Sequence, residues 1–256
     1  MQVRVLGAHN LETKETHHTC FLVDGVMAID AGSLASTLGA DEQRRVSTVL
    51  LTHLHFDHVR DLPTLGLATI DEPTAVDVFA EQRTLDSIQA HLLDGDIYPD
   101  LTRGLNEGPP SLRFRTIAAG EPLRVLGYDI DPVRADHPVP TVGYIVSSGG
   151  TRVGFSGDTG GKLLSFFTHE RAPQVLFVDV TFPDRLAERA RRSKHLTPST
   201  LERELTEALG AGVKLPRIVP VHRNLAAEAE ILKELAAVES SLGIELEPGY
   251  EDMVVA

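Results

Sequence analysis

The sequence is poor in cysteine, in basic residues and in long hydrophobic runs, and each shortage excludes a class of protein. Cys20 is the only cysteine among 256 residues, so no intrachain disulfide can form, which is typical of a reducing cytoplasm. The first seven residues lack the apolar region of a signal peptide, and no run approaches the roughly 20 apolar residues that span a membrane. We therefore expect a soluble cytoplasmic protein.

Basic residues are outnumbered by acidic ones. The chain has 24 Lys and Arg against 37 Asp and Glu, which gives a formal net charge of −13. Such a surface repels a polyanion unless a local basic patch overrides it, and the one short basic run, from Arg189 to Lys194, is interrupted by Ala190 and Ser193. Extended contact with nucleic acid is therefore not expected, whereas a small anionic substrate is compatible with bound metal ions.

The composition of the whole chain, 42% hydrophobic and 24% charged residues, is that of a folded globular protein. Turn residues separate short β-branched stretches, and Asp24-Gly25 is a hairpin signal. The patterns predict strands at 2–6, 20–23, 26–29, 47–51, 112–117, 123–125, 128–133, 142–146, 152–155, 175–178 and 218–221, and helices at 81–93, 201–209 and 226–239. Without repeats or low-complexity tracts, this order favours two packed sheets covered by helices in a single domain, 1–256.

The most informative segment is Thr52-His53-Leu54-His55-Phe56-Asp57-His58. Three imidazoles and a carboxylate within six residues are ligand types for zinc and similar ions. A turn or helix start at Asp57 would let His53 and His55 hold one metal while Asp57 and His58 hold a second. The alternative is a solvated loop, but clustered His and Asp side chains need partners, which a metal supplies.

This segment resembles the signature of the metallo-β-lactamase-fold hydrolases. The resemblance implies an α/β fold, namely a four-layer αββα sandwich of two mixed sheets with helices outside. It also implies three further ligands in chain order, and His137, Asp158 and His222 follow in that order, each in a loop after a predicted strand. Each residue alone is equally compatible with an ordinary hydrogen-bonded polar group, but the ordered set favours a metal site.

The resemblance also implies which ligand binds which ion. It assigns His53, His55 and His137 to one metal, and Asp57, His58 and His222 to the other, with Asp158 bridging both. Asp30 matches the family's buried aspartate that orients the histidine loop, although a turn-forming aspartate is the alternative. Two divalent ions about 3.5–4 Å apart activate water and polarise an electrophile. Zinc is expected, and manganese and iron also suit these ligands.

His195 directly precedes a predicted helix, in Ser193-Lys194-His195-Leu196-Thr197-Pro198. Thr197 is the predicted N-cap with Pro198 at the first helical position, and a capping box of Ser199 with Glu202 is the alternative. A histidine at this place suits contact with a phosphate oxygen or protonation of a leaving alkoxide, whereas an exposed loop histidine is the other interpretation. Asp57 and His195 are the predicted catalytic residues.

Two more segments resemble class II cyclic-nucleotide phosphodiesterases. Residues 88–100, Ile-Gln-Ala-His-Leu-Leu-Asp-Gly-Asp-Ile-Tyr-Pro-Asp, are similar to the subgroup's His-x-x-(Asn/Asp)-x-x-Ile-Trp-Pro, and residues 180–187 with 195–198 are similar to a second subgroup segment. The resemblance implies a substrate pocket that includes His91, Tyr98 and Thr197, and it implies a homodimer. A purely structural role for residues 88–100 is the alternative.

Two departures from the subgroup leave the exact substrate open. Tyr98 stands where the subgroup has Trp, and Arg223-Asn224 follows His222 where the subgroup has a residue and then Lys-Pro. The substrate is therefore open between a cyclic mononucleotide, a cyclic dinucleotide and an acyclic diester. The departures do not affect the metal chemistry.

We predict a metal-dependent phosphodiesterase for a small anionic phosphodiester, most specifically a 3′,5′-cyclic nucleotide hydrolysed to the 5′-monophosphate. A tRNA 3′-processing endonuclease shares the ligands, but the chain has no Gly- and basic-rich arm and its charge opposes tRNA binding. A lactonase, β-lactamase or thioesterase suits the bridging Asp158 less well. A metal-stabilised binding module without activity is the remaining alternative.

Overall fold

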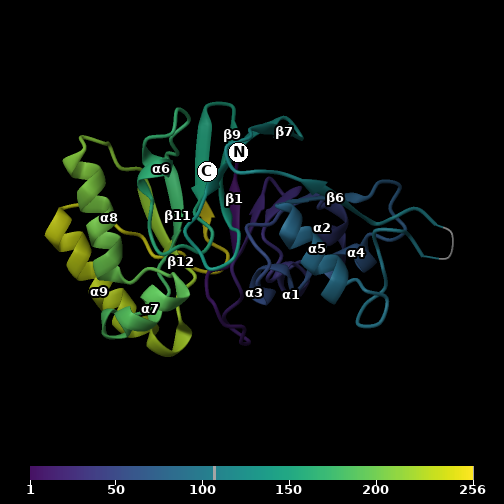
Figure 1. Ribbon diagram of the computed structural model, residues 1–256, viewed down its shortest axis with the longest axis horizontal. Helices are drawn as coiled ribbons and strands as arrows, with labels where there is room; N and C mark the ends of the chain where they lie inside the picture. Colours follow the sequence, from purple (N-terminus) through teal and green to yellow (C-terminus); the bar gives the residue numbers. More distant parts are fainter. Residues whose placement is uncertain (106–107, 256) are drawn as a thin grey trace. The chain divides into compact units, whose positions relative to one another are not determined.

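The structure is a computed structural model that describes residues 1–105 and 108–255 (Figure 1). The chain divides into two compact units, each with one β-sheet. Unit 1 comprises Met1–Gly7, Glu12–Ala118 and Glu251–Ala256, and unit 2 comprises Ala8–Leu11 and Ala119–Tyr250. The single domain predicted over residues 1–256 stays a prediction.

Unit 1 contains a seven-stranded mixed sheet in the order β13-β1-β2-β3-β4-β5-β6. The strands are β1 (Val3–Gly7), β2 (Cys20–Val23), β3 (Met27–Ile29), β4 (Thr48–Leu50), β5 (Val76–Ala80), β6 (Leu112–Thr116) and β13 (Val254–Val255). Strands β13, β1, β2 and β3 pair antiparallel, and β3 to β6 pair parallel. The predicted hairpin between β2 and β3 is confirmed, because Asp24 and Gly25 both have the positive φ of a type I′ turn, 47° and 73°.

The helices of unit 1 bury apolar residues against this sheet. They are α1 (Leu34–Thr37), α2 (Ala40–Arg45), α3 (Phe56–Val59), α4 (Leu62–Ala68) and α5 (Gln82–His91). In α5 the buried residues Leu85 and Ile88 lie at helical spacing, and they join Val49 and Val78 of the sheet in one apolar core. This core fixes β3 and β4, whose carboxyl ends carry Asp30 and the histidine segment.

Unit 2 contains a six-stranded mixed sheet in the order β12-β11-β10-β9-β8-β7. The strands are β7 (Leu123–Val125), β8 (Tyr128–Arg134), β9 (Val142–Ser148), β10 (Thr151–Phe155), β11 (Val175–Asp179) and β12 (Arg217–Val221). Strands β10, β11 and β12 are parallel, whereas the β10–β9, β9–β8 and β8–β7 pairs are antiparallel. The three parallel strands therefore end at the same edge of the sheet.

The helical segments of unit 2 are α6 (Leu164–Phe167), η1 (Asp184–Leu186), α7 (Ala187–Ser193), α8 (Pro198–Gly210), η2 (Leu225–Ala227) and α9 (Glu228–Leu242). The two long helices, α8 and α9, lie side by side (Figure 1). Their buried leucines, among them Leu205 and Leu235, form a core with Leu176 and Ile218 of the sheet. This core holds β11 and β12 in place beneath the polar residues at their carboxyl ends.

All predicted strands and helices are present, with bounds that differ by three residues at most, and the two mixed sheets with helices confirm the predicted α/β class. Strands β5 and β13 and the helices α2, α4, α6 and α7 were not predicted. Helix α4 was not predicted because it contains Pro63 and Gly66, and proline and glycine usually signal a break in a helix. Pro63 lies in the first turn, and a Cβ on Gly66 would lie 2.7 Å from the Leu101 side chain, so close packing requires the glycine.

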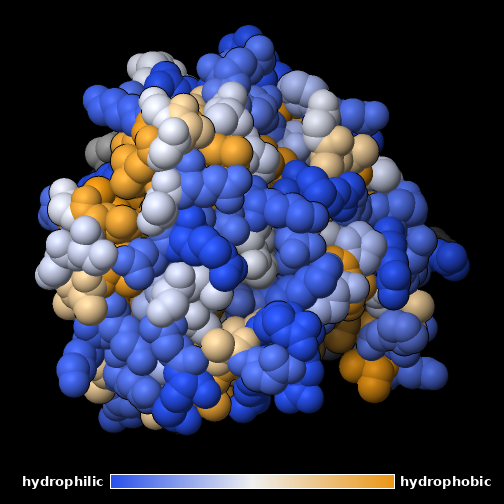
Figure 2. All heavy atoms as spheres, turned by 60° about the vertical axis from the view of Figure 1, so that its left-hand side comes forward, coloured by the Kyte–Doolittle hydropathy of each residue, from blue (hydrophilic) through white to orange (hydrophobic). Residues whose placement is uncertain are grey.

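The surface is consistent with the polar composition. The face seen in Figure 2 is mainly hydrophilic, and its hydrophobic side chains are gathered in smaller patches. Over residues 1–105 and 108–255, none of the helices combines the length and the apolar character that crossing a bilayer requires.

Candidate metal centre

In unit 1, the predicted metal-binding residues follow the carboxyl ends of two paired strands. Strand β3 ends at Ile29 and β4 ends at Leu50, and the two strands are parallel neighbours. Asp30 comes directly after β3 and is 1% exposed, with a left-handed φ of 61° that aspartate tolerates better than most residues. This conformation turns the chain so that the Asp30 carboxylate meets the loop after β4.

The Asp30 carboxylate orients two histidines of that loop. It accepts a hydrogen bond of 2.7 Å from His58 Nδ1 and bonds of 3.0 and 2.9 Å from the Thr52 hydroxyl. Because the Thr52 proton is donated to Asp30, Thr52 Oγ1 accepts from His53 Nδ1, which lies 2.9 Å away. Both rings therefore carry a proton on Nδ1, and their Nε2 atoms retain the lone pair that a metal requires.

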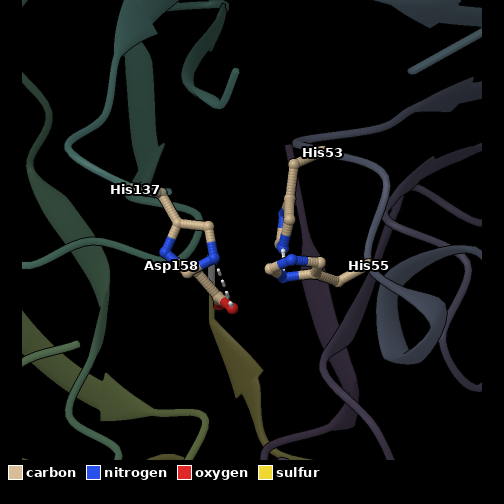
Figure 3. Close-up of side chains that lie close together, drawn as sticks. All are labelled: His53, His55, His137 and Asp158. Atoms are coloured by element: carbon tan, nitrogen blue, oxygen red, sulfur yellow. Dashed lines mark hydrogen bonds and ion pairs between the residues drawn. The ribbon is translucent and has the colours of Figure 1, made fainter. Parts of the chain in front are cut away.

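A short helix divides the histidine segment into two pairs. Helix α3 begins at Phe56, so the expected helix start near Asp57 is present. On one side of this point His53 Nε2 lies 3.0 Å from His55 Nδ1, the pair joined by a dashed line in Figure 3. On the other side His58 Nε2 lies 3.7 Å from Asp57 Oδ2. The two pairs are those expected to hold separate ions.

In unit 2, the three parallel strands β10, β11 and β12 bring polar residues to one edge. Asp158 lies three residues beyond β10, Asp179 is the last residue of β11, and His222 directly follows β12. All three side chains are buried. His222 adopts a left-handed φ of 61°, a conformation that is costly for this residue type and concentrates at functional sites.

Asp158 has a histidine near each of its carboxylate oxygens. His137 Nε2 lies 3.9 Å from Oδ2, the interaction marked in Figure 3, and His222 Nε2 lies 3.5 Å from Oδ1. These separations are too long for hydrogen bonds. Ligand atoms at about 2.0–2.2 Å from a shared zinc ion lie roughly 3–4 Å apart, so the geometry fits a carboxylate that shares one ion with each histidine.

Asp179 repeats in unit 2 the arrangement found around Asp30. Its Oδ2 accepts a 2.8 Å hydrogen bond from His195 Nδ1, and its Oδ1 accepts one of 2.6 Å from the Thr181 hydroxyl. Thr181 Oγ1 in turn accepts from His222 Nδ1 at 2.7 Å. Each unit therefore has a buried aspartate that holds one histidine directly and a second through a threonine.

The remaining histidine of unit 2 is oriented by the backbone. His137 Nδ1 donates to the Lys194 carbonyl oxygen at 3.1 Å. Lys194 ends α7 with a left-handed φ of 53°, and its side chain is paired with Asp136 at 2.9 Å. The loop that carries His195 thus also fixes the ring of His137.

The pKa values of His137 and His195 are shifted in opposite directions. Burial lowers the pKa of His137 to about 4, so this ring is neutral near pH 7 and able to bind a metal. Burial also acts to lower the pKa of His195, but the adjacent Asp179 carboxylate outweighs it and raises the pKa above its usual 6.5. In return, although burial acts to raise the pKa of Asp179, His195 holds it below its ordinary value. The pair favours an imidazolium beside a carboxylate.

The donor set fits divalent metal ions. The donors are buried or half-buried imidazole nitrogens and carboxylate oxygens, which suit zinc and other first-row ions. In unit 2, Asp158, Asp179, His195 and His222 each offer a ligand atom within 4.8 Å of the others. Hydrogen bonds to Nδ1 leave Nε2 for the ion in His53, His58, His137 and His222, as is usual for metal-bound histidines.

The residues predicted to form a substrate pocket have different surroundings. His91 lines a cavity of about 310 Å³ in unit 1 together with Leu54, Phe56 and Arg83. Phe56 is 60% exposed although it is a large apolar residue. Tyr98 instead packs against the apolar core of unit 1. Contact of His91 or Tyr98 with substrate stays a prediction.

Thr197 is fully buried and caps α8, as predicted. Its hydroxyl accepts from Thr200 N at 3.3 Å, and Pro198 is the first helical residue. The alternative capping box of Ser199 with Glu202 is wrong, because the Ser199 hydroxyl donates to Asp184 instead. Contact of Thr197 with substrate stays a prediction.

The sequence did not predict the roles of Asp179, Thr181 and Lys194. For Asp179 a signal existed, since a carboxylate after a buried strand is the pattern that identified Asp158. Thr181 and the Lys194 carbonyl have no local signature, because their partners His222 and His137 lie 41 and 57 residues away in the chain.

Comparisons with known proteins identify the family and the fold. A family model described as "Beta-lactamase superfamily domain" matches residues 19–223. Ribonuclease Z of Mycobacterium sp. is 29% identical over 153 residues, which are 54% of this chain and 51% of the relative. An octanoyltransferase of Porphyromonas gingivalis is 35% identical over 103 residues, 39% of this chain and 19% of that protein. The chain thus spans about half the length of the first relative and about a fifth of the second.

Solved structures extend the similarity to the whole chain. The metallo-β-lactamase-fold protein YhfI from Bacillus subtilis has a TM-score of 0.78 at 16% identity, with 100% of this chain and 99% of that chain covered. Unliganded yeast PDE1 has a TM-score of 0.81 at 16% identity, with 99% and 98% covered. Human tRNase Z, short form, has a TM-score of 0.70 at 17% identity, with 100% and 99% covered. At these identities the likeness shows the fold, and it confirms the one expected from the sequence.

Proposed function

Because the chain belongs to the β-lactamase superfamily and is a metal-dependent hydrolase with the metallo-β-lactamase fold, we propose that its substrate is a small anionic phosphodiester. In its most specific form, the substrate is a 3′,5′-cyclic nucleotide that is opened to the 5′-monophosphate. The observation that carries the proposal is the Asp179–His195 pair beside Asp158 and His222. The fold shared with yeast PDE1 supports it.

The proposed cofactors are two divalent ions, with zinc as the first candidate. One ion is assigned to His53, His55 and His137, the other to Asp57, His58 and His222, and Asp158 to both. When bound, such ions supply an activated water and neutralise the charge of the phosphoryl oxygens. The orienting hydrogen bonds from Asp30 and Asp179 support this assignment, because they fix the tautomer of each histidine before an ion arrives.

His195 is the proposed general acid. Asp179 holds its Nδ1 proton, so the imidazolium has its second proton on Nε2, and its side chain is 12% exposed. As water attacks phosphorus and the bond to O3′ breaks, the leaving alkoxide is strongly basic and takes that proton. A thioester hydrolase has no equal need for a histidine that a buried carboxylate keeps protonated, because a thiolate leaving group is weakly basic.

The cavity beside the histidine loop is the proposed place for the nucleobase. It is mostly apolar, about 310 Å³ in volume, and Arg83, Ser87 and His91 are its polar groups. Small-molecule sites have this composition. Leu54 and Phe56, which alternate with the ligands His53, His55 and Asp57 in the chain, form part of its wall. The exposed Phe56 ring offers a surface on which a base can stack.

The proposal is tested with a substrate panel on protein of measured metal content. The panel contains cyclic AMP, cyclic GMP, a cyclic dinucleotide, bis(p-nitrophenyl) phosphate, a lactone, a lactam and a thioester. We expect the highest kcat/KM on a cyclic nucleotide. Protein that contains two ions per chain but hydrolyses only the lactone, lactam or thioester would exclude the phosphodiester proposal.

A His195→Ala variant tests the acid. We expect kcat for cyclic AMP to fall roughly 10²–10⁴-fold, with a much smaller loss for bis(p-nitrophenyl) phosphate, whose leaving group is weakly basic. His169→Ala, which removes a histidine of unit 2 outside the cluster, is the matched control and should leave both rates unchanged. If His195→Ala retains its metal but lowers kcat by the same factor on both substrates, proton donation by His195 is ruled out.

A tRNA 3′-processing endonuclease is the second candidate, favoured by the similarity to ribonuclease Z over about half of that protein. The net charge of −13 opposes it. Cleavage of a precursor tRNA at a 3′ site, with tight and salt-sensitive binding in a gel shift, would establish this candidate in place of the first. The proposed homodimer is tested separately by light scattering coupled to size exclusion.

A further inference from the structure

Unit 2 has a second cavity, at the end of its sheet opposite the candidate metal centre. This basal cavity has a volume of about 500 Å³ and is lined in part by Arg152, Gln174, Lys214 and Arg217. Arg152 lies at the amino end of β10, Gln174 just before β11, and Arg217 begins β12. Asp158, Asp179 and His222 lie at the carboxyl ends of the same strands, so a strand length of roughly 15 Å separates the two places.

The lining of the basal cavity is cationic in a chain that is strongly acidic. Three of its side chains are basic, and no aspartate or glutamate lines it. Arg217 is paired with Glu247. Arg152 donates from Nε to the Ala172 carbonyl at 2.8 Å, but neither Arg152 nor Lys214 has an ion-pair partner among the residues that the structure describes. Two positive charges therefore remain available where the overall charge of −13 would otherwise repel anions.

Hydrogen bonds between the strands hold the polar groups of the cavity in place. The Gln174 side-chain oxygen accepts from Arg152 N at 2.9 Å, and Gln174 N donates to Arg152 O at 2.8 Å. Arg217 N donates to Gln174 O at 2.9 Å. Because its oxygen is occupied, the Gln174 amide presents its NH₂ as a further donor. The Gln174 amide and, through its bond to Ala172 O, the Arg152 guanidinium are thus preorganised, which reduces the cost of binding an anion.

We propose that the basal cavity binds a small molecule that bears a phosphate monoester. The terminal nitrogens of a guanidinium match two phosphate oxygens, and an ammonium adds a point charge. Pro173, Leu215 and Pro216 provide apolar walls for the organic part. Both the volume and the mixture of apolar walls with few polar groups are those of small-molecule sites. This site is independent of the proposed hydrolytic function.

The test exploits the five lysines of the chain, Lys14, Lys162, Lys194, Lys214 and Lys233. Reductive ¹³C-dimethylation keeps their charge and gives each an NMR signal, which single Lys→Arg variants assign. The metal-loaded protein is titrated with AMP, inorganic phosphate and adenosine. Lys214 reports the basal cavity, whereas Lys194, next to His195, reports the metal centre, so that binding at the two places is distinguished.

We expect AMP and inorganic phosphate to shift the Lys214 signal in a saturable manner, and adenosine to leave it unchanged. Arg152→Gln should weaken the AMP response of Lys214 at least tenfold. The matched control is Arg124→Gln, which removes an exposed arginine of β7 and should leave the response unchanged.

Calorimetry on unmodified protein provides a second measurement. Lys214→Gln, at an exposed position, should remove one AMP-binding event and leave any event at the metal centre. The proposal is overturned if AMP shifts only Lys194 or Lys162, if adenosine acts as AMP does, or if Arg152→Gln retains the full response of Lys214.

Discussion

At the scale of single residues, the two sheets use the same device to orient the histidines that we assign as metal ligands. Asp30 holds His58 directly and His53 through Thr52, and Asp179 holds His195 directly and His222 through Thr181. In both cases the threonine donates its only proton to the carboxylate, which leaves an acceptor for the histidine. A buried carboxylate thereby controls a ligand that it does not touch.

The first prediction concerns Thr181, the threonine of unit 2. Thr181→Val keeps the shape of the side chain and removes the hydroxyl, so His222 loses the acceptor that fixes its tautomer. We expect metal affinity to fall roughly 10–100-fold, measured by competition with a chromogenic chelator. Thr181→Ser should restore most of the affinity, and Thr206→Val, on the exposed side of α8, should leave it unchanged. Unaltered affinity in Thr181→Val would show that the hydroxyl does not act on the ligand.

The second prediction concerns the pH dependence of stability. Hydrogen bonds from Arg113 and Arg115 hold the pKa of Asp77 below its usual 3.8. Because the folded-state pKa is the lower one, the stabilisation is present above pH 3.8 and is lost as the pH falls through the folded-state value. We expect Asp77→Asn to lower the free energy of unfolding by about 1 kcal/mol at pH 7 and to have no effect near pH 2.

This comparison uses urea unfolding of wild type and variant, both with chelator, so that loss of metal at low pH does not contribute. Asp86→Asn in α5 removes another carboxylate of unit 1, one that accepts from Gln82 and not from either arginine, and it serves as the control. A difference between wild type and Asp77→Asn that is the same at pH 7 and pH 2 would contradict the assignment to charge.

At the scale of elements, local signals identified the helix that follows His195. Thr197, Pro198 and Thr200 form the start of α8, and this arrangement places His195 two residues before the cap. The same kind of signal failed for α4, where Pro63 and Gly66 are accommodated by helix geometry and by contact with Leu101. Capping depends on neighbours in the chain, whereas tolerance of a glycine depends on what packs against it.

The third prediction tests this cap. Thr197→Ala removes the side-chain acceptor for Thr200 N, so the thermal midpoint should fall by an amount equivalent to about 1 kcal/mol. Thr197→Ser keeps the hydroxyl and should retain most of the stability. Calorimetry is the measurement. If alanine and serine lower the midpoint equally, the loss arises from the buried methyl group and not from the cap.

At the scale of the whole molecule, metal binding should be coupled to folding. Ions that bind only the folded chain stabilise it by about 2.7 kcal/mol at a free concentration one hundred times Kd. For a chain of this size we expect chelation to lower the thermal midpoint by roughly 5–10 °C and to abolish hydrolysis. Zinc should restore both, and calcium, which prefers oxygen ligands, should not. A midpoint that does not change while measured metal content falls to zero would contradict this coupling.

The sequence by itself determined the features that depend on neighbouring residues. Short β-branched stretches bounded by turn residues located the strands, Asp24-Gly25 set the hairpin, and the spacing of His53, His55, Asp57 and His58 predicted a metal-binding segment. Each of these signals is contained in a few consecutive positions, because backbone conformation and side-chain direction are local properties.

Only the tertiary structure decided which groups control those residues. His222 meets Thr181 because β12 ends beside β11. His195 reaches Asp179 because Thr181 N and Phe182 N donate to Leu196 O in the loop before α8. Arg152 shares a cavity with Lys214 because the amino ends of β10, β11 and β12 also meet. A buried polar group must find a hydrogen-bond partner, but strand order decides which distant segment provides it. The histidine segment and Asp30 could therefore be predicted from the sequence, whereas the pairing of Asp179 and Thr181 with the histidines that they orient in unit 2 could not.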